Sequence, residues 1–599
     1  MASAEAPDHW LSLIDDFCDS CRSFVGGVVY RMATHRRLVA AIAQNYAAAA
    51  LPLRTAAICR LANAAASEDL HRSSRSMIEA LLAAAATLPG GPIFPINLRA
   101  DLLSLLTRRR DTFSVLQIDR LQHLDSILRW LFLRQSAVIV RRLSVHEPTS
   151  LLAFLERVEA VHPFTGGRAE LLRRLGGDPG RVAFGLFFAS MPDTPLAVVY
   201  AVVGPEKNPP SSVTSILSGT FGAETGPPAI ACFYSITNCY DGLQSLQLGS
   251  FLIFLAIEEL REEWPCLASF VTLSPVPLFG AWLRARLEGE LRQPHAGADE
   301  LRLASALKTF VEVSSAIPVT DIAGREAACP PWLRPELVRY VAHYIMFERR
   351  TVSSSFIQSR GPGFSSGTGR TKCVDPVANF HLANGGTVDR VLCCADLTAR
   401  GITAAFGCMV NYRYDLEVLS GRAPAWRYSA LGVLSSYRAA RQLLPLGSGP
   451  DVFSGFDLDD FVKDGLFSAP VLARVCSAGE MIACPEDQET QAFYIVVAGS
   501  IDVFETIPPR ETGEALWTPP HRVLCRVSAG QALGAVSEHP TTRLTFVARA
   551  SSDSECHVVV IPRETVLHLR KTRPEIAGEL RKRAMPVPSV VYTLATPKL

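Results

Sequence analysis

The sequence has 599 residues, and its 59 Lys and Arg against 58 Asp and Glu leave a net charge of +1. This balance, without a polybasic block, provides no electrostatic footprint for nucleic acid or an anionic membrane surface. Hydrophobic residues make up 48% and charged residues 20% of the chain, a globular composition that excludes a disordered protein. Because single cores stop growing at about 250–300 residues, we expect two to four domains.

The N-terminal part predicts helices. Residues 1–24 are expected to form a tail, and residues 25–190 a helical domain, because apolar residues recur there at spacings of three and four. Acidic residues near the N-terminus argue against a signal or transit peptide. The segments expected to be helical are 37–61, 76–88, 98–105, 121–133 and 150–161.

The pattern changes near Phe184, where β-branched and aromatic runs begin. Strands with interleaved helices predict an α/β or α+β domain over residues 191–445. The strands are expected at 197–203, 229–236, 270–273, 388–394 and 409–414, and a helix is expected at 249–260. That helix contains the most apolar run, but no stretch reaches the roughly 20 apolar residues of a membrane span.

Two segments in the second half of the chain are rich in small residues. Residues 352–371 are rich in Ser, Gly and Thr, and they predict a flexible loop, either a lid or simple filler. Residues 446–455 are expected to be a linker. Residues 456–585 then predict a small β-barrel with terminal helices, because short β-like runs alternate with Gly and Pro. Those runs are 492–504, 522–527, 544–550 and 557–561, and a helix is expected at 561–581.

The last segment, 586–599, ends in Pro-Lys-Leu. This tripeptide resembles the C-terminal peroxisomal address, which an import receptor reads. We therefore expect the protein in the peroxisome or a related organelle such as the glycosome, with the cytoplasm as the alternative.

The 15 cysteines are scattered along the chain. Cys18 and Cys21 form a lone CxxC, and Cys393 and Cys394 are adjacent, but no second CxxC or His pair completes a four-ligand zinc set. We expect free thiols in a reducing compartment and no metal.

The first candidate site lies between a predicted strand and an apolar helix. Free N–H groups at a helix start bind phosphate readily, and the spacing here resembles the coenzyme A pyrophosphate loop of GCN5-related N-acetyltransferases. An ordinary helix N-terminus is the alternative. The segment is Gln244, Ser245, Leu246, Gln247, Leu248, Gly249 and Ser250.

Two further candidates are Ser274 and His381. Pro275 and Pro277 fix the backbone after Ser274, so that its hydroxyl can hydrogen-bond a ligand, although a simple Ser-Pro turn has the same sequence. His381 lies beside an Asn-Gly-Gly turn and so has neighbours able to set its tautomer, although a structural role is the alternative for a lone His.

Taken together, these segments and their order resemble the malonyl-CoA decarboxylase family over residues 25–445. The resemblance is most specific at residues 375–414, DPVANFHLANG…AD…RGIT…G…NYRY. It implies a helical N-terminal domain, an acetyltransferase-like catalytic domain and malonyl-CoA as substrate. It places the catalytic pair on Ser274 and His381 and the coenzyme A loop on residues 244–250. The supporting polar positions that we expect nearby are Tyr234, Ser235, Asn384 and Tyr414.

The implied reaction needs no cofactor, because the thioester itself accepts the electrons released with CO2. An unperturbed His titrates near pH 6.5, which suits a proton donor near neutrality. The resemblance therefore assigns proton donation to His381, through or alongside Ser274, which would hydrogen-bond the carboxylate or the thioester oxygen. The family usually carries Glu where this chain has Gln247, so the loss of that charge bears on activity or its pH dependence.

The C-terminal segment resembles a cyclic-nucleotide-binding domain, with residues 530–537 at the phosphate cassette. Ala535 follows Gly534 where that family has the Glu that takes the ribose hydroxyl, and Arg543 is the nearest candidate for the phosphate-pairing Arg. Losing such charge-assisted contacts weakens nucleotide binding. A structural or oligomerisation barrel is the alternative, and we expect a homo-oligomer.

Two other functions remain open at this point. One is a coenzyme A-dependent acyltransferase on the same fold, although the sequence shows no motif for an acceptor site. The other is a cyclic-nucleotide-responsive or scaffold protein with a decayed decarboxylase half, which Gln247 favours and the intact Ser274 and His381 oppose.

Overall fold

The structure is a computed structural model in which the chain forms two compact units. The first comprises residues 1–205, 222–228 and 233–267, and the second comprises 206–221, 229–232 and 268–599. The residues that the structure describes are 9–22, 28–66, 85, 91–108, 110–134, 138–159, 161–162, 164, 166–206, 208–222, 226–292, 298–351, 371–414, 433–435, 471–483, 492–505, 523–534, 542–543, 546–552, 555–572, 574 and 593–594.

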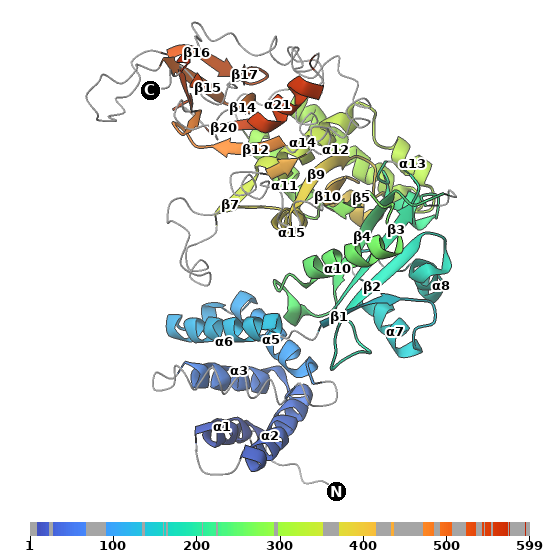
Figure 1. The fold of residues 1–599 in the computed structure, drawn as a ribbon, viewed down its shortest axis with the longest axis vertical. Coiled ribbons are helices and arrows are strands. Elements are labelled where there is room, and N and C mark those ends of the chain that lie inside the picture. Colours follow the sequence, from blue (N-terminus) through green and yellow to red (C-terminus); the bar gives the residue numbers. More distant parts are fainter. Residues whose placement is uncertain are drawn as a thin grey trace, which may run out of the picture. The chain divides into compact units, whose positions relative to one another are not determined.

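Helices fill the N-terminal part of the first unit (Figure 1, blue). The expected helix at 37–61 is two helices, because the backbone is extended at Ala50, and Pro52 fits only the first turn of the helix that follows. The segment 76–88 lies almost entirely outside the described residues. The helices are α1 (His9–Arg22), α2 (Val28–Ala48), α3 (Leu51–Ala65), α5 (Ile93–Arg108), η2 (Arg110–Thr112) and α6 (Val115–Arg134).

An antiparallel sheet follows within the first unit. β1 (Val138–Leu143) pairs with β2 (Arg181–Phe188), and β2 pairs with β3 (Ala197–Gly204). β1 and β2 lie inside the range 25–190 that we expected to be helical, so that expectation is wrong for these two strands, although α7 (Thr149–Val158) matches the helix expected at 150–161. The reason is that β2 is buried along its whole length, and a short continuous apolar run does not distinguish a strand from a helix.

The remaining elements of the first unit surround this sheet. α10 packs on β2 and β3, and it buries Leu252, Ile253, Ala256 and Leu260 at helical spacing. β4 begins in the second unit and continues in the first. The bounds are α7 (Thr149–Val158), α8 (Gly167–Leu172), η3 (Arg173–Gly177), β4 (Ile230–Asn238), η4 (Asp241–Leu243) and α10 (Leu248–Glu263).

A mixed sheet forms the centre of the second unit (Figure 1). β10 (Met409–Tyr414) pairs antiparallel with β9 (Gly386–Leu392) on one side and with β5 (Ser269–Thr272) and β6 (Ser274–Pro275) on the other. β11 (Val433–Ser435) joins β9 in parallel. The strands expected at 270–273, 388–394 and 409–414 are therefore present.

Helices and short strands cover this sheet and share one apolar core with it. α14 supplies much of that core, because it buries Leu337, Val341, Tyr344, Ile345 and Phe347. The bounds are α9 (Val213–Leu217), α11 (Phe279–Leu291), α12 (Ala298–Ala316), α13 (Ile322–Ala327), α14 (Leu333–Phe347), β7 (Arg349–Thr351), β8 (Thr371–Cys373), α15 (Pro376–Ala383) and α16 (Ala399–Ala405).

Two sheets that share a second core form the main part of the C-terminal module, residues 471–572, and β18 pairs with β21 in a separate two-stranded sheet. One continues the central sheet from β11 in the order β12-β20-β14-β17, and the other has the order β13-β19-β15-β16. The described strands thus form a two-sheet arrangement, and the expected closed barrel is not confirmed. The bounds are β12 (Val471–Cys476), β13 (Met481–Ala483), β14 (Ala492–Ala498), β15 (Ser500–Glu505), β16 (Val523–Ser528), β17 (Ala532–Gly534), β18 (Thr542–Arg543), β19 (Phe546–Ala550), β20 (Cys556–Pro562), α21 (Arg563–Thr572) and β21 (Thr593–Leu594).

The expected β-run at 492–504 is divided into β14 and β15 at Gly499, whose φ of 76° is readily adopted only by glycine. The expected linker 446–455, the loop 352–371 except Thr371, and the tail 586–599 except β21 lie outside the described residues. The domain boundaries at 190 and 445 remain predictions.

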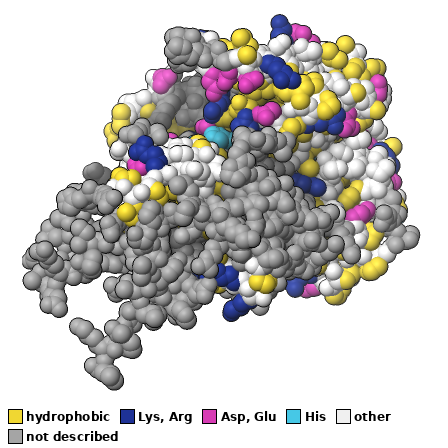
Figure 2. Space-filling model, turned by 90° about the horizontal axis from the view of Figure 1, so that it is seen from above, with side chains coloured by type: hydrophobic (Ala, Val, Ile, Leu, Met, Phe, Trp, Pro, Cys, Tyr) yellow, Lys and Arg dark blue, Asp and Glu magenta, His cyan; other side chains and the backbone are white. Residues whose placement is uncertain are grey.

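On the face seen in Figure 2, Lys and Arg side chains are interspersed with Asp and Glu side chains over the described surface. None of the described helices combines the length and apolar character that crossing a membrane requires.

Candidate functional site

α15 places His381 in its last helical turn. The helix begins where Asp375 accepts hydrogen bonds from the backbone N–H groups of Val377 and Ala378, at 2.9 and 3.0 Å, and Pro376 occupies the first turn. These are the helix-start signals of the DPVANFH sequence. His381 is 2% exposed, so its imidazole is held in a dry environment.

β10 supplies two aromatic side chains to His381. The Tyr414 hydroxyl lies 2.9 Å from Nδ1, and the Tyr412 ring stacks on the imidazole with 4.4 Å between centroids and 22° between planes. Both tyrosines lie on one face of the strand, because residues two apart point the same way. One strand therefore fixes the orientation of the ring and the partner of Nδ1.

Ser274 hydrogen-bonds the other ring nitrogen of His381, so Tyr414, His381 and Ser274 form a continuous row of hydrogen-bonded side chains. Its Oγ lies 2.9 Å from Nε2 of His381 and 2.9 Å from Oγ1 of Thr272. Ser274 is 5% exposed, and it pairs with Val410 on β10. The structure thus brings together Ser274, His381 and Tyr414, three of the residues that the sequence analysis selected.

A further layer of hydrogen bonds positions Thr272. Its Oγ1 accepts from the backbone N–H of Tyr412 at 3.2 Å, and its carbonyl accepts from Nδ2 of Asn411 at 2.8 Å. Nε of Arg390 donates to Oδ1 of Asn411 at 3.2 Å, which orients the amide. The row therefore rests on the sheet and not on a loop, which favours accurate positioning.

Burial sets the charge state of the row. Loss of solvation lowers the pKa of His381 to about 3, and it raises the pKa of Tyr414 above its ordinary value. Both groups are therefore neutral near pH 7, and the unperturbed pKa of about 6.5, from which we expected proton donation near neutrality, does not hold for the buried His381. When Ser274 donates to Thr272, Nε2–H of His381 donates to Ser274 and Nδ1 accepts from Tyr414, a consistent set for neutral imidazole.

The Asn-Gly-Gly turn connects His381 to β9. Asn384 is the C-cap of α15, and its backbone N–H donates to the carbonyl of His381. Gly385 has a φ of 79°, and a Cβ at Gly386 would lie 2.8 Å from the carbonyl oxygen of His381. The turn thus requires glycine at both positions, while the group on Nδ1 is Tyr414 and not Asn384.

The segment 244–250 belongs to the first unit. Ser245 and Gln247 have φ values of 64° and 58°, and Gln247 is the N-cap of α10. The Gln247 side chain is exposed and makes no cap hydrogen bond. The hydroxyl of Ser250 is buried and has no hydrogen-bond partner among the residues that the structure describes.

Arg99 hydrogen-bonds the backbone at the start of this segment. Its side chain is 1% exposed, and Nη1 donates to the carbonyls of Gly242 and Gln244, while Nε contacts Asp125 at 2.8 Å. A Cβ at Gly242 would lie 1.9 Å from the carbonyl oxygen of Ile96, so only glycine fits there. The backbone before α10 is therefore fixed, although its side chains are exposed.

Tyr234 and Ser235 also lie in the first unit, on β4. The Ser235 hydroxyl donates to both carboxylate oxygens of Glu159, at 2.8 and 3.0 Å, and Glu159 also accepts from the N–H of His162 at 2.8 Å. Tyr234 is 2% exposed, and its ring lies beside those of Tyr200 and His162. The two residues thus belong to a buried polar cluster around Glu159.

The remaining candidates are in the C-terminal module. Gly534 is the last residue of β17. Ala535 lies outside the described residues, as does the side chain of Arg543 on β18. The cassette therefore stays a prediction.

Sequence reasoning missed Thr272, Tyr412 and Asn411. Thr272 precedes Ser274 by two residues, and Tyr412 precedes Tyr414 by two, so the alternation of a strand would have placed each pair on one face. Asn411 has no comparable signal, because its role depends on Arg390 and on the pairing of β10 with β9.

Known proteins resemble this chain. The family model for the malonyl-CoA decarboxylase C-terminal domain matches residues 137–448. A mitochondrial malonyl-CoA decarboxylase of Rattus norvegicus is 30% identical over 343 residues, which cover 55% of this chain and 64% of that protein. One of Anser anser anser is 27% identical over 354 residues, which cover 57% and 64%. The match thus spans just under two thirds of each relative's length.

A solved structure extends the likeness to the fold. The crystal structure of malonyl-CoA decarboxylase from Cupriavidus metallidurans is 26% identical, with a TM-score of 0.51, over 73% of this chain and 100% of that one. The structure from Agrobacterium vitis is 24% identical, with a TM-score of 0.54, over the same shares.

Proposed function

The chain belongs to the malonyl-CoA decarboxylase family, and from this premise we propose that it converts malonyl-CoA to acetyl-CoA and CO2. The observation that carries the proposal is the buried row of Ser274, His381 and Tyr414, with 2.9 Å between consecutive polar atoms. This row provides a hydroxyl and an imidazole in a dry setting, which is what the reaction needs.

Loss of CO2 breaks one carbon–carbon bond and leaves its electron pair on the thioester as an enolate. A preorganised donor near a developing oxyanion contributes about 3–4 kcal/mol. Ser274 supplies that donor to the carboxylate or the thioester oxygen. Hydrogen bonds to His381 and Thr272 fix the position of its oxygen, and its proton turns from Thr272 to the substrate oxygen as charge develops.

Protonation of the enolate carbon completes the reaction and consumes one proton for each turnover. The neutral state of His381 refers to the protein without substrate, where burial disfavours the imidazolium. A bound malonyl carboxylate would raise the pKa of His381, because a neighbouring negative charge favours the protonated ring. His381 then donates through or alongside Ser274, and Tyr414 holds the ring by Nδ1.

For the substrate's coenzyme A portion we propose the segment 244–250. Its support is the start of the 16-residue helix α10, where backbone N–H groups and the helix dipole favour a phosphate group. The buried hydroxyl of Ser250, which lacks a partner among the described residues, is a further donor in this segment. Gln247 provides hydrogen bonding there without the charge of the Glu that the family usually has.

For the C-terminal module we propose a structure related to cyclic-nucleotide-binding domains in which the module has a mainly structural role, including self-association. The core shared with α14 supports the structural role, and Ala535 in place of the ribose-binding Glu argues against tight nucleotide binding. Calorimetric titration with cyclic AMP and cyclic GMP should show no micromolar binding. Saturable binding would favour a regulatory role.

We also propose that the C-terminal Pro-Lys-Leu directs the protein to peroxisomes or glycosomes. A fluorescent fusion that retains the tripeptide at its end should enter the organelle, and removal of Leu599 should leave it in the cytoplasm. An unchanged distribution would contradict the proposal.

The central test incubates the purified full-length protein with malonyl-CoA and follows acetyl-CoA and CO2. We expect turnover in the wild-type protein and its loss in Ser274→Ala. Acyl transfer to an added amine without CO2 release would instead identify an acyltransferase. Failure of the folded wild-type protein to release CO2 would favour the scaffold alternative.

A further inference from the structure

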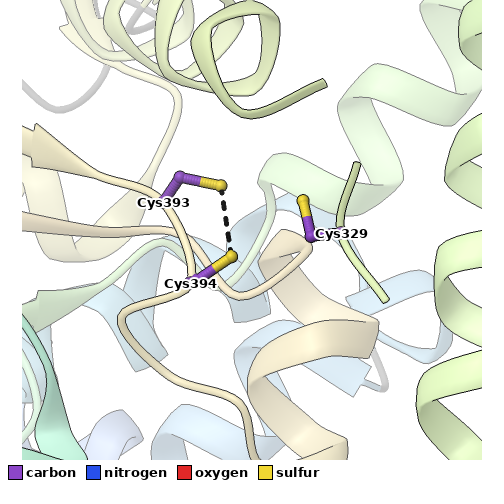
Figure 3. Close-up of side chains that lie close together, drawn as sticks. All are labelled: Cys329, Cys393 and Cys394. Atoms are coloured by element: carbon purple, nitrogen blue, oxygen red, sulfur yellow. Dashed lines mark hydrogen bonds between the residues drawn. The ribbon is translucent and has the colours of Figure 1, made fainter. Parts of the chain in front are cut away.

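Three cysteines that are separated in the sequence meet in the second unit. Cys329 lies between α13 and α14, and Cys393 and Cys394 directly follow β9. Their Sγ atoms all lie within 4.8 Å of one another, and those of Cys393 and Cys394 are 3.7 Å apart (Figure 3). None of the three forms a disulfide.

The backbone brings the two adjacent thiols together. Successive side chains of an extended strand point to opposite faces, so a Cys-Cys pair at the end of β9 would ordinarily be separated. Cys394 has a φ of 56°, in the left-handed region that non-glycine residues rarely adopt. This turn lets both Sγ atoms lie on the side of Cys329, as Figure 3 shows. Such backbone strain occurs often at functional sites.

The spacing of the thiols suits one soft cation. Zinc–sulfur bonds are about 2.3 Å long, so tetrahedral sulfur ligands lie about 3.8 Å apart. The 3.7 Å between Cys393 and Cys394 matches that edge, and Cys329, fully buried, closes a triangle of three ligands. Three converging thiols select soft or borderline cations over Mg²⁺ or Ca²⁺, which prefer oxygen ligands.

Charge favours a divalent ion. Three thiolates with one divalent cation leave a net charge of −1. Arg334 of α14 interacts electrostatically with Cys394, and its Nε donates to the carbonyl of Cys329 at 3.4 Å. Arg334 also pairs with Glu326 at 3.0 Å, so its guanidinium offsets only part of the negative charge, and a divalent cation leaves less of that charge than a monovalent one.

We propose that Cys329, Cys393 and Cys394 bind one Zn²⁺ ion, beside the buried Cys408, whose thiol interacts with Cys393. The site joins the segment before α14 to the end of β9. Leu392 of β9 pairs with Met409, and the next residue of β10, Val410, pairs with Ser274. The ion therefore stabilises the end of the β9–β10 strand pair, and β10 supplies Tyr414 and pairs with Ser274. This role is independent of the reaction proposed above.

The test uses the full-length protein, freed of metal under reducing conditions, and Cd²⁺ and Zn²⁺ as probes. We expect one equivalent of Cd²⁺ to produce the ultraviolet cadmium–thiolate charge-transfer band, and Zn²⁺ to displace it. Cys329→Ser, Cys393→Ser and Cys394→Ser should each lose the band. Cys266→Ser is the matched control, because that thiol is exposed in the other unit and should not affect the band.

A second measurement needs no variant and so does not depend on the folding of the serine mutants. Iodoacetamide labelling of the wild-type protein, mapped by mass spectrometry, should show that Zn²⁺ protects Cys393 and Cys394 while Cys266 stays reactive. No band and no protection would overturn the site. A disulfide among the three in protein that was never reduced, with no metal bound, would identify a redox pair instead and also overturn it.

Discussion

The Ser274–His381–Tyr414 row and the segment 244–250 differ in how they present their polar groups. In the row every side chain is at least 95% buried, and each polar atom already has a protein partner within 2.9 Å. In the segment the side chains of Gln244, Ser245 and Gln247 are exposed, and the backbone carries two left-handed residues. The polar groups of the row are therefore buried and already paired within the protein, whereas the polar side chains of the segment face solvent.

This difference indicates a division of labour. Groups that serve a developing charge gain from a dry, preorganised setting, whereas groups that hold a phosphate need free N–H donors at a helix start. Substitutions in the row should therefore lower kcat, and substitutions in the segment should act on KM or on backbone stability. The predictions that follow test this separation.

The largest effect is expected for His381→Ala. It removes the proposed proton donor and the partner of Ser274, so kcat should fall by about 10²–10⁴-fold, while KM changes little. Steady-state measurement of acetyl-CoA formation checks this. His123→Ala, which alters an exposed His in the other unit, is the control. Unchanged kcat in His381→Ala would remove His381 from the mechanism.

The second prediction concerns the pH dependence of stability. The folded protein keeps His381 neutral down to about pH 3, whereas the unfolded chain takes up a proton near 6.5. The unfolded state therefore binds more protons between these values, so stability falls as the pH is lowered through this window. Each pH unit below 6.5 corresponds to about 1.4 kcal/mol, or about 2 kcal/mol by about pH 5.

Urea unfolding at several pH values measures this effect as a difference between wild type and His381→Asn. The variant should lose less stability on acidification. The half-buried His343 and His557, whose pKa values are also lowered, are present in both proteins and cancel in the difference. Parallel curves for the two proteins would contradict the buried neutral state of His381.

Tyr414→Phe should have a smaller effect than His381→Ala. It removes the hydroxyl from Nδ1 and leaves a buried acceptor without its partner, at a cost of about 1–2 kcal/mol. We expect kcat to fall about tenfold with KM unchanged. Tyr340→Phe, at a half-buried tyrosine of α14, should stay near wild type. A rise in KM alone would place Tyr414 in substrate binding instead.

The smallest effect is expected at Gln247. Its left-handed conformation is strain-free only for glycine, so Gln247→Gly should raise the free energy of unfolding by about 0.5–1 kcal/mol. Gln247→Val should lower it, because a β-branched residue fits that region poorly. Thermal unfolding of the pair checks this. If both variants had the same Tm, the segment would not be held in this conformation.

The sequence motifs predicted the residues of the Ser274–His381–Tyr414 row better than they predicted the strands of the fold. Ser274, His381 and Tyr414 stand in segments with a specific order, so their meeting was predictable. β1 and β2 were not, because their short apolar runs carry no alternation. The Cys329 cluster was missed because only the fold brings that residue to Cys393 and Cys394. The pKa of His381 also required the structure, because burial is not a property of the motif.

The position of α14 has a practical consequence for shortened chains. Its buried residues share one core with strands of the central sheet and with β12, β14 and β20 of the C-terminal module, and Phe347 stacks on His557 at 4.8 Å. A protein that ends near residue 450 would present the apolar surface of this helix to water, which promotes aggregation. The C-terminal module therefore contributes to the core of the second unit, and recombinant protein used to study the Ser274–His381–Tyr414 row should include the module.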